Sequence, residues 1–81
     1  MNIYTVYDKV AEESGPLFEQ VNDGCAMRAY RKLFSNGEAS ELEYKLLFLG
    51  TIDKKTARIK LIDIPQEIYV PEQLLTKEVN D

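Results

Sequence analysis

The feature that most constrains the fold of this chain is a pair of apolar segments in its second half, the second of which alternates between apolar and basic residues. Residues 44–52, YKLLFLGTI, and residues 57–62, ARIKLI, flank the polar stretch DKKT. Successive side chains of a β-strand point to opposite faces, so alternation of apolar and polar residues is typical of strands. Two such segments joined by a short polar turn predict a hairpin. The chain is therefore expected to fold around an antiparallel pair of strands.

The first of these two segments is apolar on both faces. Leu46 and Phe48 would point to one side of the sheet, and Leu47 and Leu49 to the other. Such a strand is typical of the centre of a sheet, or of a strand whose second face meets a partner.

The N-terminal quarter carries one strand signal and one breaker. Residues 2–7, NIYTVY, are rich in β-branched and aromatic types and predict a strand, with Tyr4 and Val6 on the same face. Residues 8–20 contain a Gly-Pro pair among acidic residues, and they predict a loop or a frayed turn of helix.

The clearest helix signal covers residues 23–35. Asn22 and Asp23 are favourable N-cap residues, and apolar residues then recur at i, i+3, i+4 and i+7. These apolar residues are Ala26, Ala29, Tyr30 and Leu33. The Asn-Gly pair that follows at 36–37 is a natural stop, because both residues tolerate positive φ.

The remaining segments are weaker. Residues 38–43 predict a polar loop, residues 66–70 between two prolines predict an edge strand, and residues 71–79 predict a last short helix that begins at a proline. The expected fold class is therefore α+β: a small single domain over residues 1–81, with the order β-α-β-β and a weak C-terminal element. One helix would pack on one face of a small sheet.

Packing one helix on one face of a sheet leaves the other face largely open. The apolar residues expected on that open face are Tyr4, Val6, Leu47, Leu49 and Ile62. Two alternatives stay open: a second copy of the chain covers this face, or the C-terminal segment does. Dimerisation is a common way for so small a chain to add buried area.

Composition and charge bound the partners and the location. The 81 residues suffice for one domain, and the net charge of -4 is not that of a general nucleic-acid binder. The single cysteine, Cys25, cannot form a disulfide within the chain, which favours a reducing compartment. The start of the sequence does not resemble a signal peptide, and the longest apolar run, Leu46–Leu49, is too short to cross a membrane. We expect a cytoplasmic protein without a membrane partner.

The residue types argue against catalysis. The sequence has no histidine, which removes the commonest general base and the commonest metal ligand, and Cys25 has no histidine to activate it. None of the glycines forms a phosphate-binding motif, and the acidic residues do not have calcium-loop spacing. We therefore expect a protein without enzymatic activity, without a metal site and without a cofactor.

The charge is distributed unevenly along the chain. Residues 28–60 hold eight basic and four acidic residues, a net charge of +4, whereas the remainder has a net charge of -8. Tyr30 and Phe34 flank the helical basic residues. The candidate nucleic-acid-binding residues are Arg28, Arg31, Lys32, Lys54, Lys55, Arg58 and Lys60. They predict a basic patch for a phosphate backbone with aromatic rings for bases; the alternative is that they are solvated faces of a helix and a hairpin, paired with loop acids.

The N-terminal half combines a short strand, an acidic stretch with Gly-Pro, and a helix rich in Ala and Arg. The residues of this pattern are Asp8, Ala11, Glu12, Gly15, Pro16, Leu17, Phe18, Glu19, Asn22, Asp23, Ala26, Arg28 and Ala29. The later hairpin adds Tyr44, Leu46, Leu47, Leu49, Gly50, Ile52 and Asp53. In these residues the sequence resembles the small nonstructural protein of gokushoviruses, which are single-stranded DNA phages of the microvirus family.

The resemblance covers about residues 2–65 and implies a phage protein made in the cytoplasm of the bacterial host. It further implies either DNA binding or a role in single-stranded genome synthesis or packaging. Two hypotheses follow. In the first, the basic residues bind single-stranded DNA. In the second, the chain is a protein-interaction module, either a homodimer or an adaptor or inhibitor that binds a phage or host replication protein.

Overall fold

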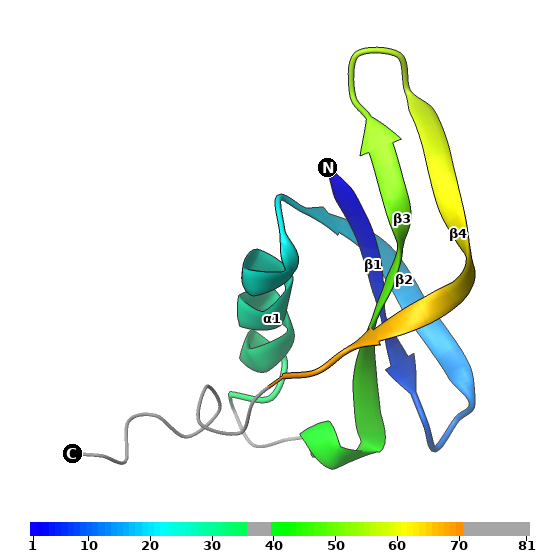
Figure 1. Cartoon of the computed structure of the whole chain (residues 1–81). Helices are drawn as coiled ribbons and strands as arrows, with labels where there is room; N and C mark the ends of the chain where they lie inside the picture. Colours follow the sequence, from blue (N-terminus) through cyan, green and yellow to red (C-terminus); the bar gives the residue numbers. More distant parts are fainter. Residues whose placement is uncertain (36–39, 71–81) are drawn as a thin grey trace.

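The structure, a computed structural model that describes residues 1–35 and 40–70, contains a four-stranded antiparallel sheet with one α-helix against one of its faces (Figure 1). Along the chain the elements are β1 (Asn2–Asp8), β2 (Glu13–Gln20), α1 (Asp23–Lys32), the short 3₁₀ helix η1 (Glu41–Glu43), β3 (Tyr44–Asp53) and β4 (Arg58–Ile68). The strand order in the sheet is β2-β1-β3-β4. One helix on one face of a small sheet is confirmed, but the sheet has one strand more than the sequence predicts.

The additional strand is β2, where the prediction of a loop over residues 8–20 was wrong. The turn before it is built locally: the side-chain carboxylate of Asp8 accepts hydrogen bonds from the backbone N–H groups of Val10 and Ala11, at 2.9 and 3.0 Å. Glu12 then takes a positive φ of 62°, which reverses the chain and lets β2 pair antiparallel with β1. Aspartate favours such turns because its side chain replaces a backbone acceptor.

The Gly-Pro pair does not break β2 because a bulge accommodates it. Thr5 pairs with Leu17 and Tyr7 with Ser14, so one residue of β1 faces two residues of β2, Gly15 and Pro16. The bulge leaves the carbonyl of Gly15 to accept a hydrogen bond from the hydroxyl of Thr5, at 3.0 Å. Bulges are among the few places in a sheet where proline is tolerated, since it lacks an N–H.

The helix begins where the sequence predicts and ends earlier. Asn22 is the N-cap, and its side-chain oxygen accepts a hydrogen bond from the N–H of Cys25 at 2.9 Å. The helix ends at Lys32 and continues as a turn to Ser35, whereas the prediction extended it to residue 35. Leu33, in the predicted apolar stripe, is 54% exposed, whereas Phe34, which extends that stripe, packs against the core from the turn that follows the helix. The stop signal at 36–37 lies outside the described residues.

The predicted hairpin is confirmed as β3 and β4. β4 continues through Pro65 and joins the segment predicted as a separate edge strand, so both form one strand at the edge of the sheet. Leu61 lies opposite Gly50 and Gln66 opposite Phe48, so four residues of β4 face a single residue of β3. This irregularity coincides with the bend of β4 in Figure 1. The helix predicted over 71–79 lies outside the described residues.

The core lies between α1 and the sheet, and its centre is Tyr4. This residue is completely buried, and its ring lies 5.8 Å from that of Phe18 and 5.7 Å from that of Phe48, measured between centroids. Its hydroxyl donates a hydrogen bond to the carboxylate of Asp23, in the first turn of α1, at 2.5 Å. The other buried apolar residues of this cluster are Ala26, Tyr30, Leu46 and Ile68.

The expectation that Tyr4 and Val6 lie on the open face of the sheet was wrong. Both point toward α1, Tyr4 as the centre of the core and Val6 packed against it. The prediction that Tyr4 and Val6 share one face of β1 was correct, but the prediction of which face the helix covers was wrong. Ile3 and Thr5, which point the other way, are nevertheless 6% and 2% exposed.

Gly50 is required by the close approach of two strands. A Cβ at this position would meet the carbonyl oxygen of Lys60 and lie 2.8 Å from the Cα of Leu61, both of which are backbone atoms. We expect Gly50→Ala to lower the free energy of unfolding by about 3 kcal/mol, since overpacking and backbone strain act together. Urea denaturation would measure the loss. The control is Gly24→Ala, where a Cβ meets only the Asn22 side chain at 3.5 Å and the change should be stabilising by up to about 1 kcal/mol.

Two buried tyrosines should make stability depend on alkaline pH. Burial and the hydrogen bond to Asp23 raise the pKa of Tyr4 to about 12, and burial with the charges of Glu41 and Glu67 raises the pKa of Tyr30 to about 12. Because these values lie above the ordinary tyrosine value of about 10, the neutral phenols favour the folded state. Their contribution is complete below about pH 10 and is lost as the pH rises through about 12.

Alkaline titration followed by tyrosinate absorbance tests this expectation. Of the five tyrosines, two should ionise late and together with unfolding. Tyr4→Phe should remove one of the late ionisations and lower the free energy of unfolding at neutral pH by about 1 kcal/mol, since Asp23 is exposed and water replaces the lost donor. Five tyrosines that all ionise near their ordinary pKa in the folded protein would contradict the burial of Tyr4 and Tyr30.

Candidate nucleic-acid interface

Four of the seven predicted nucleic-acid-binding residues lie together on the projecting end of the β3–β4 hairpin. We call residues 51–61 the arm. It extends past the end of the sheet made with β1, whose last bonds to β3 are the two between Met1 and Ile52, and Figure 1 shows it standing clear of α1. The basic residues of the arm are Lys54, Lys55, Arg58 and Lys60.

The tip of the arm is a compact turn held by Asp53. Its carbonyl accepts hydrogen bonds from the N–H groups of Thr56 and Ala57, at 3.2 and 2.6 Å, and its carboxylate accepts one from the N–H of Lys55 at 3.0 Å. Ala57 takes a positive φ of 63°, which returns the chain into β4. The side chains of both lysines are therefore presented at the end of a defined turn.

One cation of the arm is engaged by an acid. Lys54 forms an ion pair with Glu19 of β2 at 2.7 Å, and the two side chains are 59% and 37% exposed. Exposed pairs of this kind contribute little to stability and are weakened by salt. Among the described residues, no carboxylate pairs with Lys55, Arg58 or Lys60.

The arm has two chemically different faces because of the alternation of β4. Ile59 lies opposite Ile52, and both line a groove with Ile3, which points away from α1. Arg58 and Lys60 alternate with Ile59 and so point to the α1 side. One face of the arm is basic and the other is apolar, and both are exposed to solvent.

The helical candidates form a smaller and separate group. Arg28 and Lys32 are exposed and line a shallow groove of about 230 Å³ with Gln20 and Cys25. Arg31 is half-buried, so the three do not make one exposed stripe. The structure does not bring this group together with the arm, because α1 packs against β1 and β2 (Figure 1).

The aromatic rings expected beside the helical basic residues are not accessible to bases. Tyr30 is 4% exposed, and its hydroxyl donates a hydrogen bond to the carbonyl of Glu41 at 3.3 Å. Phe34 packs on Tyr30 and on Tyr44, with centroids 5.0 and 5.3 Å apart. These rings pack together at the edge of the core and do not form a surface on which bases could stack. The amphipathic spacing of the helix fitted either role.

The predicted interface residues do not share one face. Leu47 lies on the face away from α1, half-buried beside Thr5, and Leu49 is the extra residue of a bulge opposite β1. Ile62 is 37% exposed and lies in the irregular stretch of β4 opposite Leu49. The exposed apolar residues that the sequence analysis missed on the open face are Leu17, Ile59 and Leu61. The alternation of β4 was visible in the sequence; the position of Leu17 depended on recognising β2.

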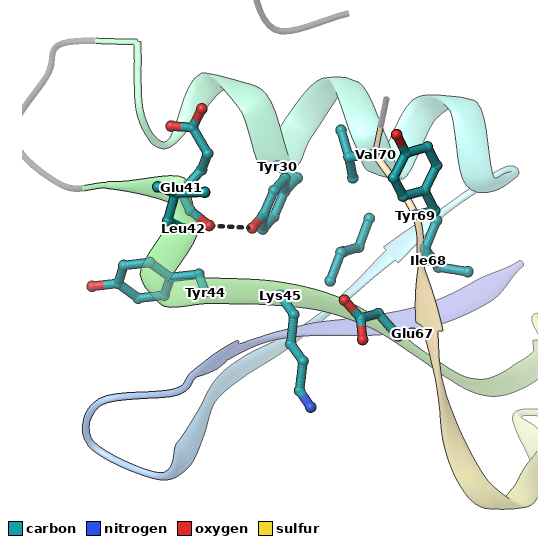
Figure 2. A pocket seen from close by; sticks show the side chains of 10 residues that line it. Tyr30, Glu41, Leu42, Tyr44, Lys45, Glu67, Ile68, Tyr69 and Val70 are labelled. Carbon is teal, nitrogen blue, oxygen red and sulfur yellow. Dashed lines mark hydrogen bonds between the residues drawn. The ribbon is translucent and has the colours of Figure 1, made fainter. Parts of the chain in front are cut away.

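A second hollow lies where the end of β4 meets η1 and the start of β3 (Figure 2). It has a volume of about 350 Å³, and its ionisable lining includes Glu41, Glu67 and Lys45 with three tyrosines. The tyrosine at its back, Tyr30, has a pKa raised to about 12 by burial and by those two acids, so its hydroxyl is a hydrogen-bond donor at neutral pH. The hollow thus has two acids and one lysine in its lining, which disfavours a phosphate ligand.

The described residues show neither a candidate metal site nor a candidate membrane-spanning helix. Residues 1–35 and 40–70 contain no cluster of three or more acidic or cysteine side chains that could hold a metal ion. No helix in those residues is long and apolar enough to span a bilayer.

Comparison with known proteins finds a family model that covers most of the chain. The family model described as Phage ORF5 protein matches residues 1–74, which include every described element. No curated protein sequence and no solved structure matches the chain. The match confirms the resemblance to a small phage nonstructural protein, and its extent covers nearly the whole sequence. This chain therefore belongs to the Phage ORF5 protein family.

Proposed function

We propose that this phage protein binds single-stranded DNA through the basic face of its arm and has no catalytic activity. The setting would be the cytoplasm of a bacterium infected by a gokushovirus-like phage, during synthesis or packaging of the single-stranded genome. The proposal needs neither a metal nor a cofactor, since phosphate binding by lysine and arginine is electrostatic.

The observation that carries the proposal is the concentration of positive charge on the arm. Arg58 and Lys60 are exposed and point to the same side, and Lys54 and Lys55 lie at the turn next to them. The local charge differs in sign from the net charge of -4 of the whole chain. Like charges on the body of the protein repel a phosphate backbone, so they would confine binding to the arm.

The geometry also supports a contact with a strand rather than with a closed site. The arm is a two-stranded ribbon that stands away from the body, and its apolar face lies on the reverse of its basic face. A flexible single strand can follow such a ribbon with its phosphates, and sequence preference is expected to be weak because phosphate contacts carry no sequence information. The helical pair Arg28 and Lys32 would be a second, weaker contact.

Binding of a labelled single-stranded oligonucleotide, followed by fluorescence anisotropy, tests the proposal. Lys54 is engaged by Glu19, which leaves three cations of the arm for phosphate contacts. If each of the three neutralises one phosphate, the slope of log affinity against log salt is about -2.1, and affinity falls roughly 20-fold between about 50 and about 200 mM salt. Arg58→Glu/Lys60→Glu should reduce this slope by about two-thirds and weaken binding at low salt by more than about 10-fold, since two contacts are replaced by repulsion.

Two controls separate the arm from the rest of the surface. Arg28→Glu/Lys32→Glu makes the same change in charge on α1 and should weaken binding much less. Lys9→Glu, in the exposed turn at the opposite end of the sheet, should bind as the parent does. Equal losses for the arm and helix variants would show that only the total charge matters. Absence of binding at about 100 μM protein at low salt would exclude DNA as the ligand, since typical non-specific affinities would be visible there.

The second candidate function is a protein-interaction module, a homodimer or an adaptor or inhibitor that binds a replication protein of the phage or host. The observation that favours it is the exposure of large apolar side chains on β4: Ile59 and Leu61 are 58% and 64% exposed. Such residues clustered on one exposed edge strand mark an interaction surface more often than scattered single ones do. The two functions use different faces of the arm and are compatible.

A further inference from the structure

The face of the sheet away from α1 carries an apolar surface that no described element covers. Leu17, Ile59 and Leu61 are 63%, 58% and 64% exposed, and they come from strands at the two opposite edges of the sheet. Ile3 and Ile52 lie between them on the central strands. We call these five residues the open apolar face. Their number and adjacency distinguish them from single exposed leucines, which are ordinary on protein surfaces.

The open apolar face has both a groove and a protrusion. The groove has a volume of about 320 Å³ and is lined by Ile3, Leu17, Ile52 and Ile59, together with Phe18 and Glu19. Leu61 lies two residues beyond Ile59 on β4, opposite Gly50, and points to the same side. It stands beside the groove and does not line it. A surface with an apolar hollow beside an apolar protrusion is complementary to itself under a twofold rotation, as an isologous interface requires.

The charges agree with a second copy as the occupant of this surface. Arg58 and Lys60 point to the opposite side of the arm, so two chains that meet through the open apolar face do not oppose their cations. The ionic groups at the edge of the groove are Lys54 and Glu19, one of each sign and already paired at 2.7 Å. A partner with strong charge of either sign would gain nothing there, whereas an identical surface meets it with balanced charge.

The area required is modest. A standard interface buries about 800 Å² on each partner, roughly one-seventh of the 5939 Å² of accessible surface of this chain. The central core is small, with six buried apolar residues in the described part of the chain. Ile3 already belongs to these six. Burial of the other four residues of the open apolar face by association would offset this deficit, as is common for chains of this size.

We infer that the open apolar face is a homodimer interface, in which Leu61 of each copy enters the groove between Leu17 and Ile59 of the other. The inference deepens the interaction-module candidate by naming the partner and the surface, and it does not rest on DNA binding. In such a dimer the two basic faces point outward on opposite sides. One dimer then presents two arms to the same DNA strand or to two DNA strands, which raises avidity without new kinds of contact.

Analytical ultracentrifugation of the full chain over a range of concentrations tests the inference. The parent chain is expected to be a dimer. Leu61→Asp should weaken dimerisation by at least about 30-fold, the effect of removing an interface hot spot. Ile59→Asp should act in the same direction. Because both residues are exposed in the single chain, the circular dichroism and thermal unfolding of the isolated monomer should change little.

The matched control is Ile64→Asp, the same substitution at a residue of β4 that is 78% exposed but lies in the irregular stretch opposite Leu49, outside the open apolar face. It should leave the dimer intact. A parent chain that stays monomeric up to about 1 mM, where even a millimolar Kd would populate the dimer, overturns the inference. So does a dimer that Ile64→Asp disrupts and Leu61→Asp does not. Arg58→Glu/Lys60→Glu should still dimerise, and monomeric Leu61→Asp should still bind a short oligonucleotide if the arm binds DNA, so the two proposals fail separately.

Discussion

The burial of Tyr4 between α1 and the sheet is the constraint on which the arrangement of this small fold depends. Its hydroxyl donates a hydrogen bond to the carboxylate of Asp23, in the first turn of α1, at 2.5 Å, and accepts one from the side-chain amide of Asn2 at 3.0 Å. The ring of Tyr4 meanwhile packs between Phe18 of β2 and Phe48 of β3. One residue thus orients the helix and unites three strands, and a buried phenol without this acceptor would be costly.

The position of the helix determines the chemistry of both surfaces. Since α1 covers β1 and β2 on one side only, the opposite side of the sheet keeps its apolar residues in solvent. The hairpin extends beyond the reach of α1, so both faces of the arm remain accessible. Its alternation then separates Arg58 and Lys60 from Ile59 and Leu61. The basic and apolar surfaces proposed for DNA and for a second copy are two faces of the same ribbon.

Several elements could be predicted from local signals, and the failures share one cause. The hairpin and the helix with its Asn22 cap follow from alternation, periodicity and capping, which act over a few residues. β2 was missed because Gly15 and Pro16 oppose a strand locally, while the bulge that accepts them depends on pairing with Thr5 and Tyr7. The aromatic residues Tyr30 and Phe34 fitted both a core and a stacking surface, since periodicity does not distinguish the two.

By itself, the sequence determined the arm: its strands, its polar turn and the alternation of cations with apolar residues all lie within residues 44–62. It also determined the family, through a match over residues 1–74. Only the tertiary structure decided which face of the sheet α1 covers, and therefore that Tyr4 and Val6 are core residues while Leu17, Ile59 and Leu61 are exposed. The physical reason is that alternation defines two faces but not which one is buried; that choice is made by long-range packing between segments distant in the chain.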